Sequence, residues 1–140
     1  MNSYLLDTHI VIWLLRDSEH LNSNIREDID YFQHLYYVSV ETLREIVILQ
    51  SLNKITFKPD LDKIINDLQE RQIGIVPVEV NHIKVLEKLP VLTIHGKTHD
   101  DPFDRLIIAQ AIANKYTLIS SDKKFPFYKD YKLKLLANER

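Results

Sequence analysis

Residues 3–16 read SYLLDTHIVIWLLR, and the pattern of this stretch changes at its one acidic residue, Asp7. Residues 3–6 are short and apolar, which is typical of a buried strand. From residue 9 to residue 16, Ile10, Trp13 and Leu14 recur at the spacing of one helix face. A strand that runs directly into a helix favours an α/β fold, and it places Asp7 at the carboxyl end of the strand.

The same alternation continues outward along the chain. Further short apolar stretches predict strands at 36–38, 73–76, 117–119 and 133–135. Apolar residues at helical spacing predict helices at 22–32, from the N-cap Ser39 to about 52, and at 60–71, 80–89 and 102–114. We expect Gly74 to end the helix at 60–71, residues 90–100 to form a loop, and Pro102 to begin the last helix. This order of elements indicates an α/β fold with a mainly parallel sheet.

Length and composition indicate one domain over residues 1–140. Apolar residues make up 45% of the chain and charged residues 27%, and the two glycines leave no flexible linker. The absence of cysteine excludes disulfides, thiolate metal sites and a cysteine nucleophile. No apolar run approaches the roughly 18 residues of a membrane span, and the N-terminus lacks the basic region of a signal peptide. We therefore expect a cytoplasmic protein that does not bind membranes.

The net charge of the chain helps to distinguish between possible nucleic-acid functions. The formal net charge is −2, whereas proteins that bind nucleic acid passively usually carry a basic bias. The value counts against a simple nucleic-acid-binding module. It counts less against a nuclease, because a nuclease can hold acids in its site and neutralise them with metal ions.

Four acids fall where side chains can converge on the carboxyl edge of the sheet, namely Asp7, Glu45, Asp104 and Asp122. Asp7 directly follows a predicted strand, and Asp122 comes just after another. Glu45 lies in the second turn of one predicted helix, and Asp104 in the first turn of another. Converging carboxylates repel one another, and a hard cation such as Mg²⁺ or Mn²⁺ is the usual reason for bringing them together. Each acid alone also suits an ordinary role as a helix cap, an exposed helix acid or a turn residue.

Four segments in order carry a resemblance to a known family. They are LLDTHIVIWLL at 5–15, LREI at 43–46, HDDPFDRLIIAQA at 99–111 and LISSD at 118–122. These segments resemble the motifs of the PIN-domain family, and most closely its branch of VapC-type toxins from toxin–antitoxin pairs. The third segment is the most specific match, and the four together cover nearly the whole chain.

The resemblance implies a Mg²⁺- or Mn²⁺-dependent endoribonuclease with a PIN-like three-layer fold, in which helices cover both faces of a five-stranded parallel sheet. It assigns the catalytic and metal-binding roles to Asp7, Glu45, Asp104 and Asp122. It adds Thr8, Asp101 and Ser120 as supporting residues. It also implies an RNA substrate, an antitoxin protein as partner and a homodimer.

Other residues remain open to more than one interpretation. Glu41 lies one helical turn before Glu45 and competes for the same role, although the sequence around Glu45 fits the motif better. Arg105 and Lys123 are candidates for binding RNA phosphate, with an ion pair as the alternative for Arg105. His99 either contacts phosphate or fixes the loop before Pro102.

A lone histidine and the single tryptophan favour structural roles, whereas an aromatic stretch is open to two interpretations. We expect His9 to pack rather than to bind metal, and Trp13 to belong to the core, because it falls on the apolar face of its helix. The aromatic stretch at 31–36 fits either core packing or a groove for a partner.

Two other functions are consistent with parts of the sequence. A non-catalytic interaction module of the same fold would suit the acidic net charge, but it would not need all four acids. A receiver-like phosphoacceptor domain would need an Asp at the end of its third strand. Here the strand at 73–76 runs on into Pro77, Val78 and Glu79, so this function is disfavoured.

Overall fold

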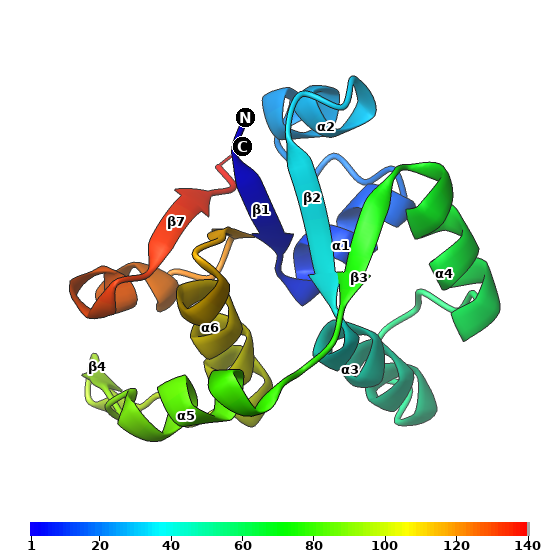
Figure 1. The fold of residues 1–140 in the computed structure, drawn as a ribbon. Coiled ribbons are helices and arrows are strands. Elements are labelled where there is room, and N and C mark those ends of the chain that lie inside the picture. The colour runs from blue at the N-terminus through cyan, green and yellow to red at the C-terminus, as the bar shows by residue number, and fades with distance from the viewer. Residues whose placement is uncertain (140) are drawn as a thin grey trace.

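The computed structural model describes residues 1–139 and is built on a five-stranded sheet in the order β3-β2-β1-β6-β7. All four neighbouring pairs run parallel (Figure 1). The strands are β1 (Ser3–Leu6), β2 (Leu35–Ser39), β3 (Ile73–Val76), β6 (Thr117–Ser120) and β7 (Lys134–Ala137). The α/β fold with a parallel five-stranded sheet, expected from the sequence, is confirmed.

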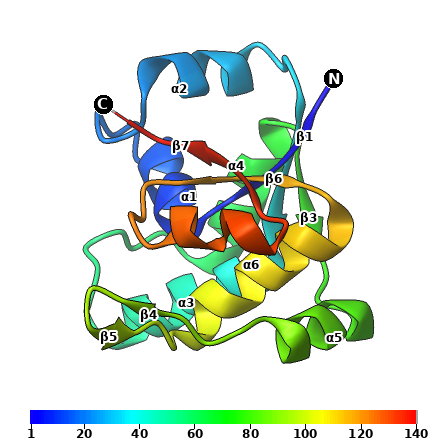
Figure 2. The same ribbon diagram turned by 90° about the vertical axis from the view of Figure 1, so that its left-hand side faces the viewer.

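Helices cover both faces of this sheet (Figures 1 and 2). They are α1 (Thr8–Leu15), α2 (Ser23–Asp30), α3 (Val40–Ser51), α4 (Leu61–Glu70), α5 (Val80–Lys88) and α6 (Pro102–Asn114), with a 3-10 segment η1 (Phe125–Tyr131). Successive strand residues point to opposite faces. Leu6 accordingly packs among α1, α2, α3 and α4, while its neighbour Leu5 packs against α6 and η1. The result is two apolar layers on either side of one sheet.

The region expected as a loop at 90–100 contains a small antiparallel hairpin. Its strands are β4 (Thr93–Ile94) and β5 (Lys97–Thr98), and they pair only with each other. His95 and Gly96 connect them with φ values of +51° and +78°. Positive φ at both central residues is the requirement of the tight turn that suits a two-residue hairpin. Strands of two residues are too short to show an alternating pattern, so the sequence did not predict them.

Gly74 does not end a helix, contrary to the expectation from the sequence. Helix α4 ends at Glu70, and Gln72 takes the left-handed conformation that reverses the chain, with φ +59°. Gly74 lies inside β3, where an added Cβ would stand 2.9 Å from Cδ1 of Tyr37. The Tyr37 ring is stacked on Tyr116, with centroids 5.0 Å apart and planes 14° apart. The glycine therefore makes room for a cross-strand ring rather than for a turn.

The strand order reverses at β1, because β2 and β3 lie on one side of it and β6 and β7 on the other. Parallel sheets offer a crevice at the carboxyl ends of the strands where the order reverses. Asp7 follows β1 at this point, and Asp122 comes two residues after β6. Among the described residues, none of the helices is long and apolar enough to cross a membrane.

Replacing Gly74 by alanine tests the packing of Tyr37. We expect Gly74→Ala to lower the free energy of unfolding by about 1–3 kcal/mol in urea denaturation, because the new methyl group overpacks the space under the ring. In a Tyr37→Ala background the same change should cost less than about 1 kcal/mol, because no ring opposes the methyl group. An equal cost in both backgrounds would contradict the packing argument.

Candidate active site

Asp7 holds the centre of the site at the end of β1. Its backbone N–H donates to the carbonyl of Ile119 at 3.0 Å, which ties it to β6. One carboxylate oxygen accepts the N–H of Thr8 at 2.8 Å, and the other accepts the hydroxyl of Ser120 at 2.7 Å. Burial raises the pKa of Asp7, while these two hydrogen bonds lower it. Asp7 therefore caps α1 and also lies at the reversal point of the sheet.

Glu45 approaches the same place from α3. The Thr8 hydroxyl donates to its carboxylate over 2.6 Å. Burial raises the pKa of Glu45 most strongly, the bond from Thr8 lowers it, and the charges of Asp7 and Asp101 raise it again. Glu41, the rival from the sequence, instead forms an ion pair with Arg44 at 2.8 Å. The structure thus brings Glu45, not Glu41, to Asp7.

Asp122 is placed by the loop after β6. Its N–H donates to the Ser120 hydroxyl at 3.0 Å, so this hydroxyl binds Asp7 and Asp122 at once. The Asp122 carboxylate accepts the N–H of Lys124 at 2.8 Å and lies 3.3 Å from the Lys124 ammonium group. Ser120 and Thr8 both donate hydrogen bonds to carboxylates of the cavity.

Asp101 and Asp104 are set by the start of α6. The Asp101 carboxylate accepts the N–H groups of Phe103 and Asp104 at 2.9 and 3.0 Å, so Asp101 is the N-cap of the helix. Burial raises the pKa of Asp104 to about 8, and the charges of Asp101, Asp7, Asp122 and Glu45 raise it as well. The charge of every other acid of the site therefore contributes to the raised pKa of Asp104.

A buried histidine holds Asp104 from behind. His99 is 4% exposed, and its Nε2 lies 3.1 Å from the Asp104 carboxylate while its Nδ1 lies 2.7 Å from the Tyr128 hydroxyl. Burial lowers the pKa of His99, whereas the pKa of Asp104 is raised. At neutral pH the two groups therefore share a neutral hydrogen bond rather than an ion pair. His99 fixes the acid, and Tyr128 from η1 fixes His99.

Five carboxylates border one cavity of about 460 Å³, those of Asp7, Glu45, Asp101, Asp104 and Asp122. Their oxygens are the donors that a hard divalent cation prefers, and their mutual repulsion gives such an ion a favourable place. In residues 1–139 no three acidic or histidine side chains stand close enough to enclose an ion as they are placed. Mg²⁺ usually keeps several waters and takes only one or two carboxylates directly. The donor set therefore fits a hydrated ion.

Several residues have a different place from the one the sequence suggested. The Arg105 guanidinium donates to the carbonyls of Leu89 and Pro90 at 2.9 and 3.0 Å, and not to an acidic side chain of the described residues. It anchors the chain before the hairpin, which favours a structural role over phosphate binding. Lys123 borders a neighbouring pocket, and Lys124 is the lysine at the acidic cavity.

Sequence reasoning missed Tyr128 and the hydrogen bond between His99 and Asp104. The position of His99 five residues before Asp104, within the third motif, was the available signal for that bond. Tyr128 offered none. Trp13, expected in the core, packs against it but also lines the acidic cavity together with His9.

The raised pKa of Asp104 predicts how stability depends on pH in a chelator. The folded protein keeps the Asp104 proton up to about pH 8, while the unfolded chain releases it near the ordinary value of 3.8. Between these values the folded state binds more protons, so its stability falls as pH rises. We expect urea unfolding from pH 5 to pH 8 to show a steeper fall for the parent than for Asp104→Asn. Equal slopes for both proteins would contradict the raised pKa.

Comparison with known proteins gives a consistent assignment. The PIN-domain family model matches residues 4–130. No curated protein sequence matches the chain significantly.

Three similar solved structures share the fold. The first is a VapBC2 complex from Rickettsia felis bound to a DNA fragment from its promoter, with a TM-score of 0.68, 17% identity and coverage of 98% of this chain and 99% of that chain. A DNA-bound VapBC from Salmonella typhimurium has a TM-score of 0.62, 13% identity and 98% coverage of both chains. VapBC-1 from nontypeable Haemophilus influenzae has a TM-score of 0.60 and 16% identity, covering 96% of this chain and 97% of that chain.

At these identities the structural likeness concerns the fold, while the family model spans most of the sequence. The parallel sheet, the acids at its carboxyl edge and the match over residues 4–130 agree with one another. The chain belongs to the PIN-domain family.

Proposed function

We propose that this protein is a metal-dependent endoribonuclease that hydrolyses RNA phosphodiester bonds at the acidic cavity. The observation that carries the proposal is the convergence of acids from four separate segments on one cavity. Burial there raises the pKa of Asp104 to about 8, and the charges of the other four acids raise it as well. Like charges gathered at one cavity repel one another, and a bound cation offsets this repulsion. Family membership supports the same chemistry.

Asp7, Glu45, Asp104 and Asp122 are the residues that would hold Mg²⁺ or Mn²⁺, with Asp101 at the rim. A bound ion would make an attacking water more acidic and would neutralise charge on the phosphate. Hydrolysis adds this water across a P–O bond, leaving a phosphate monoester on one fragment and a hydroxyl on the other.

The protein's own contribution is positioning. The Ser120 hydroxyl sets Asp7 and the backbone N–H of Asp122 relative to each other, and Thr8 sets Glu45. His99 keeps Asp104 in place from the buried side. One acid of this set accepts the proton that the attacking water loses. The ammonium group of Lys124 lies at the same rim, where it can meet an RNA phosphate.

The biological setting follows from the family and from the similar structures, which are of VapBC complexes, two of them bound to DNA. We extend to this chain the role of the toxin in a type II toxin–antitoxin pair. Its partner would be an antitoxin protein, and residues 1–140 would act as one domain in a cytoplasmic homodimer.

Substitution of the central acids tests the proposal. We expect Asp7→Asn and Asp104→Asn each to slow cleavage of single-stranded RNA and tRNA about a hundredfold or more, because each change removes a carboxylate from the cation site. Gel assays with Mg²⁺, with Mn²⁺ and with EDTA would measure the rates. Cleavage that survives both substitutions and the chelator would overturn the proposal. A folded parent that binds Mn²⁺ but cleaves no RNA would favour the non-catalytic module.

The two glutamates of α3 provide a matched pair. We expect Glu45→Gln to slow cleavage about a hundredfold, because Glu45 borders the cavity. Glu41→Gln, one helical turn away, should change the rate by less than about twofold, because Glu41 is paired with Arg44 and does not border the cavity. The reverse order of effects would move the second-motif role to Glu41.

A further inference from the structure

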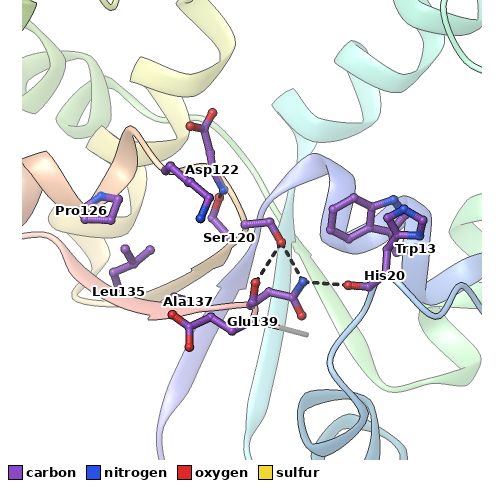
Figure 3. A pocket seen from close by; sticks show the side chains of 11 residues that line it. Trp13, His20, Ser120, Asp122, Pro126, Leu135, Ala137 and Glu139 are labelled. Atoms are coloured by element: carbon purple, nitrogen blue, oxygen red, sulfur yellow. Dashed lines mark hydrogen bonds between the residues drawn. The ribbon is translucent and has the colours of Figure 1, made fainter. Parts of the chain in front are cut away.

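We propose that a second pocket, which continues from the acidic cavity past Trp13, holds an unpaired nucleobase of the RNA substrate, with the Trp13 ring as its stacking platform. The proposal rests on the ribonuclease function proposed above and names a subsite of it. The second pocket measures about 660 Å³ and lies between Trp13 and strand β7 (Figure 3). Trp13, Ser121 and Asp122 border both cavities, so the two spaces adjoin at these residues.

Three aromatic rings follow one another from the first cavity to the second. His9 and Trp13 are one helical turn apart on α1, and their ring centroids lie 5.8 Å apart. The centroid of His20 lies 5.3 Å from that of Trp13, with the planes tilted by 35°. Both histidines are exposed, and Trp13 is half-buried. Single-stranded RNA is commonly held by stacking its splayed bases on rings of this kind.

The charges of the second pocket favour a base over a phosphate. Asp122 and Glu139 bring two carboxylates to its lining against the one ammonium group of Lys123. A phosphate would be repelled there, whereas a neutral base would not. Pro126 and Leu135 add apolar surface to the lining, as a base face requires (Figure 3). The phosphates would instead lie at the acidic cavity, where a cation can neutralise them.

The polar groups of the lining are largely committed within the protein. The Asn138 amide donates to the His20 carbonyl at 2.9 Å and to the Ser121 hydroxyl at 2.7 Å, and its oxygen accepts the N–H of Asn22 at 2.7 Å. The Ser121 hydroxyl donates in turn to the Asn138 carbonyl. Because these groups are occupied, the pocket recognises the face of a base rather than its edge. We therefore expect a strong preference for unpaired RNA and a weak preference among bases.

Trp13 is the only tryptophan in the chain, so its fluorescence reports directly on this pocket. The titration uses Asp104→Asn with Mg²⁺, so that bound RNA stays largely intact. We expect a single-stranded hexaribonucleotide to quench Trp13 emission, whereas a duplex of the same sequence, whose bases are already stacked, should leave it unchanged. Emission that does not respond to the single strand while the labelled strand binds would overturn the proposal.

Variants at Trp13 separate stacking from packing. In the same background, Trp13→Leu should raise the Kd of the labelled single strand about tenfold, and Trp13→Phe should restore most of the affinity because it restores a ring face. Tyr31→Leu, which removes an exposed ring at the end of α2, is the control and should leave the Kd unchanged. Circular dichroism and urea unfolding would confirm that each variant is folded. Equal Kd values for Trp13→Leu and its parent would overturn the proposal.

The subsite and the ribonuclease function can fail separately. Cleavage by the unmodified protein together with silent Trp13 emission would remove the subsite and keep the ribonuclease. Quenching by single strands without cleavage by the unmodified protein would keep base binding and remove the ribonuclease.

Discussion

Repulsion among carboxylates is the constraint that the rest of the structure accommodates. Five acids border one cavity at the carboxyl edge of the sheet, and the charges of the other four add to burial in raising the pKa of Asp104. The fold brings them together because parallel strands end at the same edge, and because α3 and α6 begin beside that edge. Hydroxyl and backbone donors then stabilise individual acids without cancelling their total charge. We propose that a cation balances this total charge.

The side chains that orient the acids lie on two sides of the cavity. On the side of β1 and β6, the Thr8 hydroxyl donates to Glu45 at 2.6 Å and the Ser120 hydroxyl donates to Asp7 at 2.7 Å. On the side of α6, the buried His99 joins Asp104 to Tyr128. The hydroxyls on the side of β1 and β6 contact the acids directly. On the side of α6, the contacts extend through Tyr128 into the apolar layer under η1. Asp104 is thereby linked to core packing, which explains why burial is the largest cause of its raised pKa.

The sequence predicted the features that depend on the order of elements along the chain. It failed where a side chain distant in sequence determines the role of a residue. Asp7 and Asp122 follow strands, so the rule for parallel sheets was enough to bring them together. Ser39 is the N-cap of α3 as predicted, because capping is local. Gly74 was misread because the ring that needs its space comes from the neighbouring strand. The contacts of Arg105 were missed because its acceptors are backbone carbonyls, and Tyr128 because no periodicity marks the 3-10 segment that carries it.

The central claim is that these acids form one cation site whose repulsion a divalent ion relieves. Calorimetric titration of Mn²⁺ at pH 7, in two buffers with different ionisation enthalpies, tests it most directly because the difference between buffers counts the protons released. Since the pKa of Asp104 is about 8, most of the metal-free protein carries a proton there at pH 7. We expect Mn²⁺ to bind and to release close to one proton from Asp104 at that pH. An absence of Mn²⁺ binding, or binding that releases no proton, would contradict the account.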